Sequence, residues 1–91
     1  MIRTVNLLIS GRVQGVYFRR FAKNKADALG VKGTVRNRED GKVEIVAQAE
    51  DDILESFIQW CHKGPITAKV EKVEMTELPL KDAQYQSFEI I

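Results

Sequence analysis

Cysteine, histidine and proline are scarce in this chain of 91 residues, which contains one cysteine, one histidine and two prolines. A lone cysteine, Cys61, cannot form an internal disulfide, so the class of disulfide-rich secreted domains is excluded. Cys61 has no companion ligand at a metal-binding spacing, and His62 falls in the last turn of an expected helix, where a cation suits the helix dipole. We therefore expect structural roles for both side chains and no metal site.

Long hydrophobic runs are also missing, because the apolar stretches are short and interrupted by charged residues. This pattern predicts no membrane partner, and the first residues lack the basic stretch and apolar segment of a secretory signal. We therefore expect a cytoplasmic protein. With 44% hydrophobic and 30% charged residues, residues 1–91 fit a single domain with one modest core. Nothing in the sequence demands a dimer, so we expect a monomer.

Acidic side chains are absent from the first 26 residues, which carry six basic ones. The remaining 65 residues carry 13 acidic and 8 basic side chains, so the net charge of +1 conceals a strong polarisation along the chain. A basic segment of this kind attracts small anions. This segment includes Arg12, Arg20 and Lys23. We interpret these three side chains as a solvated helix face or rim, and the catalytic role that stays open to them is to steer an anion toward the loop.

Two hydrophobic periods alternate along the chain. Val5, Leu7 and Ile9 recur at every second residue, as in a strand, whereas apolar residues recur at three- and four-residue intervals over two later segments, as in helices. The expected elements are strands over 4–10, 31–37, 42–49, 68–77 and 88–90, and helices over 18–29 and from 51 or 52 to 63. This order predicts an α+β fold, a ferredoxin-like βαββαβ sandwich in which two helices pack on one face of an antiparallel sheet.

Two local features are expected within these elements. Asp52 followed by Glu55 fits a capping box at the start of the second helix. In the strand over 68–77 the apolar residues change from one face to the other, which predicts a bulge near Glu71 or Lys72.

The segment Gly11–Arg19, which reads GRVQGVYFR, places two glycines in a short loop directly before a helix. Glycine tolerates backbone angles that turn successive N–H groups toward one point, and a helix N-terminus adds unpaired donors and a favourable dipole for an anion. The Arg19 guanidinium matches the spacing of two phosphate oxygens. The loop therefore predicts a site for a phosphate or a carboxylate, although such glycine pairs also occur as plain turns.

GRVQGVYFR is followed by GTVRN at residues 33–37 and by Gly41 and Val43, and in this order and spacing the segments resemble the acylphosphatase family. The similarity continues through Gly64 and Pro65, residues 68–73 and residues 87–90, so it covers nearly the whole chain. The resemblance implies a ferredoxin-like enzyme that hydrolyses acyl phosphates to a carboxylate and inorganic phosphate. It also implies that neither a metal nor an organic cofactor takes part.

The resemblance also assigns site residues. Loop amides and Arg19 would hold the phosphoryl oxygens, and the Asn37 carboxamide would orient the attacking water. Because an acyl phosphate expels a carboxylate, whose conjugate acid has a pKa of about 4 to 5, the leaving group needs no general acid. The family's phosphate-binding loop falls on Gln14, Gly15, Val16, Tyr17 and Phe18, its essential arginine on Arg19 and its essential asparagine on Asn37.

Three residues depart from the family pattern. Relatives usually carry a small residue, often glycine, where this chain has Tyr17, and a bulky side chain can restrict the loop backbone and slow catalysis. Thr34 stands where an aromatic residue is more common, and Ala49 replaces a glycine. Both lie away from the two essential positions.

Two other functions stay open at this point. A ferredoxin-like domain can bind a ligand without catalysis, because fold alone does not decide function. Nucleic acid is disfavoured as that ligand, since the strands offer acidic residues such as Glu44 and Glu71 rather than exposed aromatic residues on a basic face. Similar domains also occur in larger hydrogenase-maturation proteins that handle carbamoyl phosphate, but those carry cysteine-rich zinc sites.

Overall fold

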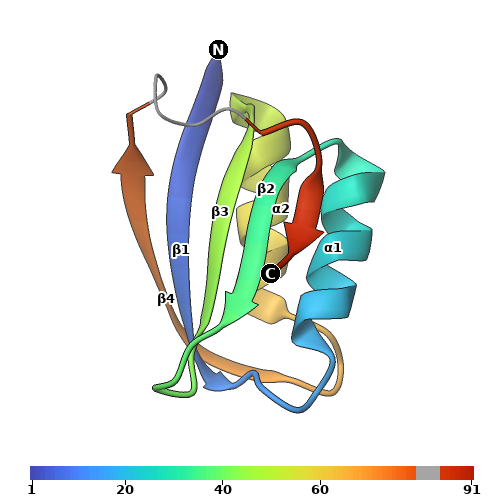
Figure 1. Cartoon of the computed structure of the whole chain (residues 1–91), viewed down its shortest axis with the longest axis vertical. Helices are drawn as coiled ribbons and strands as arrows, with labels where there is room; N and C mark the ends of the chain where they lie inside the picture. The colour runs from blue at the N-terminus through green and yellow to red at the C-terminus, as the bar shows by residue number, and fades with distance from the viewer. Residues whose placement is uncertain (80–84) are drawn as a thin grey trace.

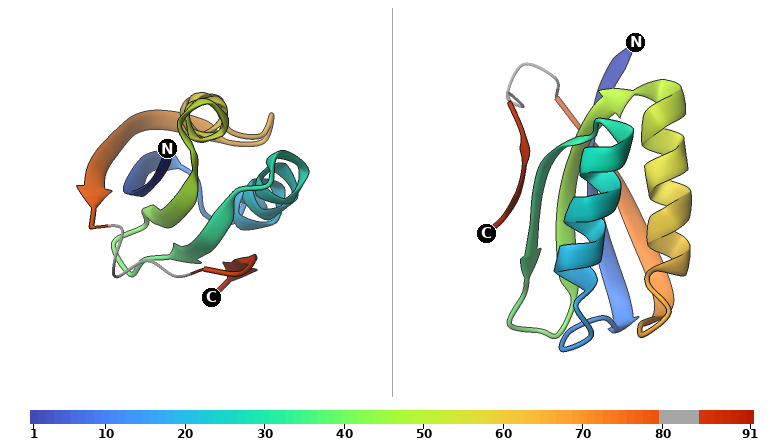
Figure 2. Two further views of the ribbon diagram at one scale, coloured as in Figure 1. Left: turned by 90° about the horizontal axis from the view of Figure 1, so that it is seen from above. Right: turned by 90° about the vertical axis from the view of Figure 1, so that its right-hand side faces the viewer.

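Two helices and five strands form two layers in the computed structural model, which describes residues 1–79 and 85–91. The elements are β1 (Ile2–Arg12), α1 (Phe18–Leu29), β2 (Lys32–Asn37), β3 (Val43–Glu50), α2 (Asp51–Lys63), β4 (Lys69–Leu78) and β5 (Phe88–Ile90). The strands lie in the order β4-β1-β3-β2-β5, and the two helices lie side by side on one face of the sheet (Figure 1; Figure 2). The predicted ferredoxin-like α+β class is confirmed.

The sheet is mixed rather than antiparallel. β1 pairs antiparallel with β3 and β4, and β2 pairs antiparallel with β3, but β5 runs parallel to β2, with Val35 opposite Ile90. β4 ends at the end of the sheet where β2 begins. β5 begins at the same end, with Phe88 opposite Gly33, and therefore runs in the direction of β2.

The core lies between the sheet and the two helices. Alternate residues of β1 and β3 are buried on the helical side, as their period of two predicts. The buried side chains include Val5, Leu7, Ile9, Val43, Ile45 and Ala47 from these strands, Phe18, Ala22 and Ala26 from α1, and Leu54, Phe57 and Cys61 from α2. Phe21 is 43% exposed, so the buried stripe of α1 is narrower than its apolar spacing predicts.

One of the two expected local features is present. Ser10 pairs with Lys72 and Gly11 with Val70, so Glu71 is the extra residue of a bulge in β4, as predicted. The helix α2 begins at Asp51, within the predicted range, but the capping box is wrong, because the N-cap is Glu50, which makes no side-chain cap bond. Asp52 instead lies in the first turn, where its Oδ1 accepts a hydrogen bond of 2.9 Å from the Ile53 N–H.

Gly33 lies where β2 passes close to β3. Its φ of 141° is one that side chains rarely adopt, and a Cβ at this position would lie 1.8 Å from the carbonyl oxygen of Val46. We expect Gly33→Ala to lower the free energy of unfolding by about 3 kcal/mol in urea denaturation, because left-handed strain and overpacking add. Gly30→Ala is the matched control, since Gly30 has a φ of 82° with no atom within 4 Å of the added Cβ, and should cost about 1 kcal/mol. Equal midpoints for the two variants would contradict the close approach.

Glu44 lies on β3 with its side chain 20% exposed, between polar groups of the two neighbouring strands. Asn6 Nδ2 donates a hydrogen bond of 3.0 Å to the Glu44 carboxylate, and Arg36 forms an ion pair with it. The Asn6 hydrogen bond, followed by the contribution of Arg36, holds the pKa of Glu44 below its ordinary value of 4.5, although burial opposes this shift.

The lowered pKa predicts a pH-dependent contribution to stability. Because the folded pKa lies below the unfolded one, the Glu44 carboxylate stabilises the fold above about pH 4.5, and this contribution is lost as the pH falls through the lowered value. We therefore expect the difference in unfolding free energy between the wild type and Glu44→Gln to be largest near neutral pH and to shrink below about pH 4.5. Urea titrations at a series of pH values measure it, and a difference independent of pH would refute the assignment.

Candidate active site

A pocket of about 220 Å³ lies where β1 passes through a loop into α1 and where β2 ends. Its lining residues are Val13, Gly15, Tyr17, Phe18, Arg19 and Asn37. Arg19 lies in the first turn of α1 and Asn37 is the last residue of β2, and both are half-buried. The structure thus brings the two residues proposed as essential to the same pocket, together with three of the five loop residues.

The loop backbone leaves its donors unpaired. Gly15 has a φ of 75° and Tyr17 a φ of 62° with a ψ of 24°, both left-handed conformations that turn neighbouring N–H groups toward one side. Within the part of the chain that the structure describes, the N–H groups of residues 15–19 donate no hydrogen bond, and Phe21 N is the first to bond back, to Tyr17 O at 3.1 Å. The loop and the start of α1 therefore form a cluster of free amide donors suited to an anion.

Tyr17 is the one non-glycine residue with a positive φ among residues 1–79 and 85–91. A side chain at such a position costs roughly 1–2 kcal/mol. The loop nevertheless adopts the left-handed conformation, and the Tyr17 side chain is 76% exposed at the rim of the pocket. Thr34 on β2 and Ala49 on β3, the other two departures from the family pattern, do not line the pocket.

Arg19 has no carboxylate partner among the described residues. Arg3 contacts Glu77 and Arg38 contacts Asp40, whereas Arg12 and Arg20, like Arg19, form no ion pair among these residues. The forked donors of Arg19 are therefore available to an oxyanion that enters the pocket.

Asn37 contributes an unsatisfied acceptor. Its Oδ1 is buried and has no hydrogen-bond donor among the residues that the structure describes. Leaving a buried polar atom unpaired costs about 1–3 kcal/mol, so such an atom calls for a functional explanation. Asn37 also lines the pocket, so its carboxamide is placed to contact a ligand or a water molecule there.

Two side chains hold the loop from either side. Gln14 Nε2 donates to the carbonyl oxygens of Arg38 at 2.8 Å and Lys42 at 2.9 Å, in the turn between β2 and β3. On the other side, Thr67 Oγ1 donates to Val16 O at 2.8 Å. The structure thus directs the Gln14 side chain to the turn rather than into the pocket, and Val16 also lies outside the pocket lining. Thr67 was missed from the sequence, because no motif distinguishes it from any other loop threonine.

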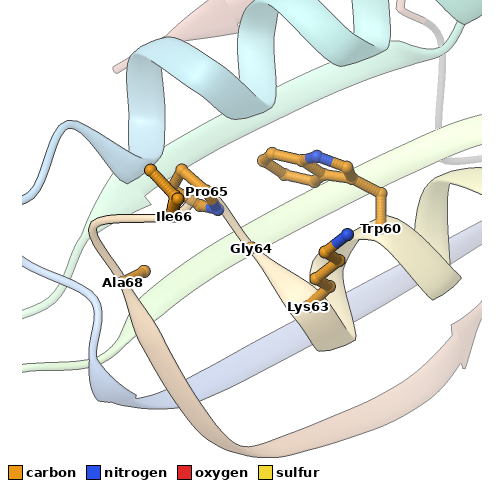
Figure 3. A pocket seen from close by; sticks show the side chains of 6 residues that line it. All are labelled: Trp60, Lys63, Gly64, Pro65, Ile66 and Ala68. Carbon is orange, nitrogen blue, oxygen red and sulfur yellow. The ribbon is translucent and has the colours of Figure 1, made fainter.

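A second cavity, of about 460 Å³, lies at the C-terminal end of α2 and is lined by Trp60, Lys63, Gly64, Pro65, Ile66 and Ala68. The Trp60 indole ring and the Pro65 and Ile66 side chains lie on the same side of the chain around Gly64 (Figure 3). None of the site residues predicted from the sequence lines this cavity, and Lys63 is its one charged side chain. It supplies no group suited to hydrolysis. Trp60 does support the site, because its ring packs against that of Phe18 with centroids 5.6 Å apart.

Within residues 1–79 and 85–91, the His, Cys, Asp and Glu side chains form no group of three or more that could hold a metal ion. Neither helix in this part of the chain has the length and apolar character required to cross a membrane. The Cys61 thiol is fully buried, and this burial raises its pKa far above the ordinary range, so it is unsuited to be a nucleophile.

The chain is similar to known proteins over nearly its whole length. The family model for acylphosphatase matches residues 5–90. An acylphosphatase from Nitrosococcus oceani is 46% identical over 99% of this chain and 99% of its own length. The crystal structure of an acylphosphatase from Bacillus subtilis superposes with a TM-score of 0.91 at 36% identity, covering 100% of this chain and 99% of that one. An acylphosphatase from Coxiella burnetii gives a TM-score of 0.93 at 33% identity, over 99% and 93% of the two chains. The chain belongs to the acylphosphatase family.

Proposed function

We propose that residues 1–91 act as one domain that hydrolyses acyl phosphates to a carboxylate and inorganic phosphate. The observation that carries this proposal is the meeting of three kinds of unpartnered group at one pocket. These groups are the N–H donors of residues 15–19, the Arg19 guanidinium and the buried Oδ1 of Asn37. The first two suit phosphoryl oxygens, and the third suits a water molecule.

The phosphoryl group would lie against the loop. Its oxygens would accept hydrogen bonds from the amides of residues 15–19, at the positive end of the α1 dipole, and from two nitrogens of Arg19. Phosphoryl transfer spreads negative charge over these oxygens in the transition state, so donors fixed in advance stabilise it without reorganisation. Gln14 would contribute by holding the loop against the β2–β3 turn rather than by touching phosphate with its side chain.

Asn37 would place the nucleophile. A water molecule that donates a hydrogen bond to Asn37 Oδ1 would present its lone pair to phosphorus from the β2 side of the pocket. Because the bound water is already oriented, the entropy cost of bringing it into line with phosphorus is met before the transition state, and this effect can supply much of the rate acceleration.

Proton transfer needs no protein acid or base in this scheme. None of the six residues that line the pocket carries a carboxylate or an imidazole. The P–O bond to the acyl group breaks with its electron pair leaving on the carboxylate, which is stable unprotonated at neutral pH. The proton lost by the attacking water would pass to a phosphoryl oxygen of the product.

We further propose that the protein works as a cytoplasmic monomer on this small-molecule substrate, without metal, organic cofactor or nucleic acid. The single cysteine fits a reducing compartment, because one cysteine cannot form an internal disulfide. Charge supplied by Arg19 and by amide dipoles takes the place that a metal ion occupies in other phosphoryl-transfer sites.

Benzoyl phosphate hydrolysis, followed by absorbance in the presence of a chelator, tests the activity. We expect steady turnover that the chelator does not reduce. Saturable binding of inorganic phosphate without turnover would instead support a ligand-binding domain. Activity that appears only after a divalent metal is added would refute the metal-independent scheme.

Arg19→Gln should lose both phosphate binding and turnover, with kcat/KM falling about 10³-fold or more, because a guanidinium aimed at phosphoryl charge can be worth that much. Arg19→Lys should also fail, since an ammonium cannot form two parallel hydrogen bonds. Kinetics with benzoyl phosphate and calorimetry with inorganic phosphate measure the two effects. Arg12→Gln is the control, because Arg12 is exposed and lies outside the pocket lining. Arg19→Gln retaining the kcat/KM of Arg12→Gln would remove Arg19 from the site.

Asn37→Ala should keep phosphate binding but lose turnover by about a hundredfold or more, because the water loses its orientation while the loop donors remain. The loss should fall on kcat rather than on KM. The matched control is Asn24→Ala, which removes an exposed carboxamide on α1. A near-normal kcat for Asn37→Ala would show that the nucleophile is placed by another group.

A further inference from the structure

A cleft of about 200 Å³ adjoins the proposed phosphate pocket and is lined by Tyr17, Arg19, Arg20 and Ile90. It shares Tyr17 and Arg19 with the phosphate pocket. A substrate whose phosphoryl group is held by Arg19 and the loop amides therefore has this cleft beside its acyl group.

The cleft is built by α1 and β5. Tyr17 is the left-handed N-cap of α1 and Arg20 lies in the first turn of that helix, and both residues line the cleft. β5 runs alongside α1 (Figure 1), and Lys23 Nζ donates a hydrogen bond of 2.7 Å to the carbonyl oxygen of Phe88. This bond fixes β5 against α1, so that Ile90, two residues further on, reaches the side chains at the start of the helix.

The lining has the chemistry of a site for an apolar group that ends in an anion. Ile90 and the ring of Tyr17 supply exposed apolar surface. Arg20 is exposed and forms no ion pair among the described residues, and no acidic side chain lines the cleft. Because Arg19 is used by the phosphoryl group, Arg20 is the cation left for a second anionic group.

The backbone conformation and the exposure of Tyr17 also support a ligand site in this cleft. It occupies a left-handed position at a cost of roughly 1–2 kcal/mol, where glycine would cost nothing. The residue is 76% exposed, so the protein gains little core packing from it. A strained residue that exposes an aromatic ring at the shared rim of two clefts indicates a contact with ligand.

We propose that Tyr17, Arg20 and Ile90 form the acyl-group subsite of this enzyme, and that Arg20 selects acyl phosphates whose acyl group carries a second anionic group on an apolar or aromatic body. This inference rests on the proposed function and names its substrate class. Arg20 is thereby a specificity-determining residue, rather than one of several cations that steer anions from a distance.

Two substrates that differ in one group test the subsite. 4-Carboxybenzoyl phosphate carries the second anion, and 4-methylbenzoyl phosphate has a similar size without it. The wild type should prefer the carboxylated substrate in kcat/KM. Arg20→Gln should lower the ratio of the two kcat/KM values about five- to tenfold, through a higher KM for the carboxylated substrate, as expected for a lost charge-assisted hydrogen bond. The melting temperature should stay unchanged, because Arg20 is exposed.

Arg12→Gln is the matched control, because it removes the same charge from an exposed position outside both clefts. Because long-range steering acts on the total charge of the substrate, the loss of Arg12 should lower kcat/KM slightly more for the carboxylated substrate, so that the ratio of the two values changes by about twofold or less, well below the change in Arg20→Gln. A ratio unchanged in Arg20→Gln, or changed equally in Arg12→Gln, would overturn the subsite while leaving acyl phosphate hydrolysis intact. If the wild type hydrolyses neither substrate, the proposed function fails and the subsite fails with it.

Discussion

The structure depends on a loop that keeps its N–H groups free for a ligand and must therefore be held in place by other atoms. Residues 15–19 donate no hydrogen bonds within the described part of the chain, so the loop lacks the backbone pairing that normally fixes such a segment. Gln14 and Thr67 supply the support, through hydrogen bonds to carbonyl oxygens on either side. The loop is thus held by a side-chain donor, Gln14 Nε2, and a backbone acceptor, Val16 O, while its backbone N–H groups stay available for binding.

The same support places the two halves of the site relative to one another. Gln14 binds the carbonyl oxygen of Arg38, the residue directly after Asn37, so one side chain connects the loop to the end of β2. An intramolecular hydrogen bond contributes only about 0.5–1.5 kcal/mol to stability. The main effect of the Gln14 hydrogen bond is therefore on geometry, because the Arg19 guanidinium on a helix and the Asn37 carboxamide on a strand must keep a fixed relative position to act on one substrate. The ferredoxin-like sheet provides this by ending β2 beside the β1–α1 loop.

The sequence predicted what local periodicity and contiguous motifs encode. The order of elements, the ends of α1 and α2, and the Glu71 bulge all follow from apolar spacing and glycine placement. The meeting of Arg19 and Asn37 followed from resemblance and was not visible in spacing alone. Thr67, 51 residues from its partner Val16, and the parallel pairing of β5 could not be predicted. Both depend on how distant segments pack, which leaves no local signal. Gln14 was predicted as a loop residue, but the direction of its side chain is a property of the folded turn.

The strand order also bears on self-association. β5 covers the outer edge of β2 with three residues, which leaves β4, ten residues long, as the long edge of the sheet. Long edge strands can recruit other chains and start fibrils. β4 counters this tendency with a bulge and with the charged side chains Lys69, Glu71, Lys72, Glu74 and Glu77, which an incoming strand would have to desolvate. The acidic excess of the later part of the chain thus acts as a guard against aggregation, at the edge farthest in strand order from β5.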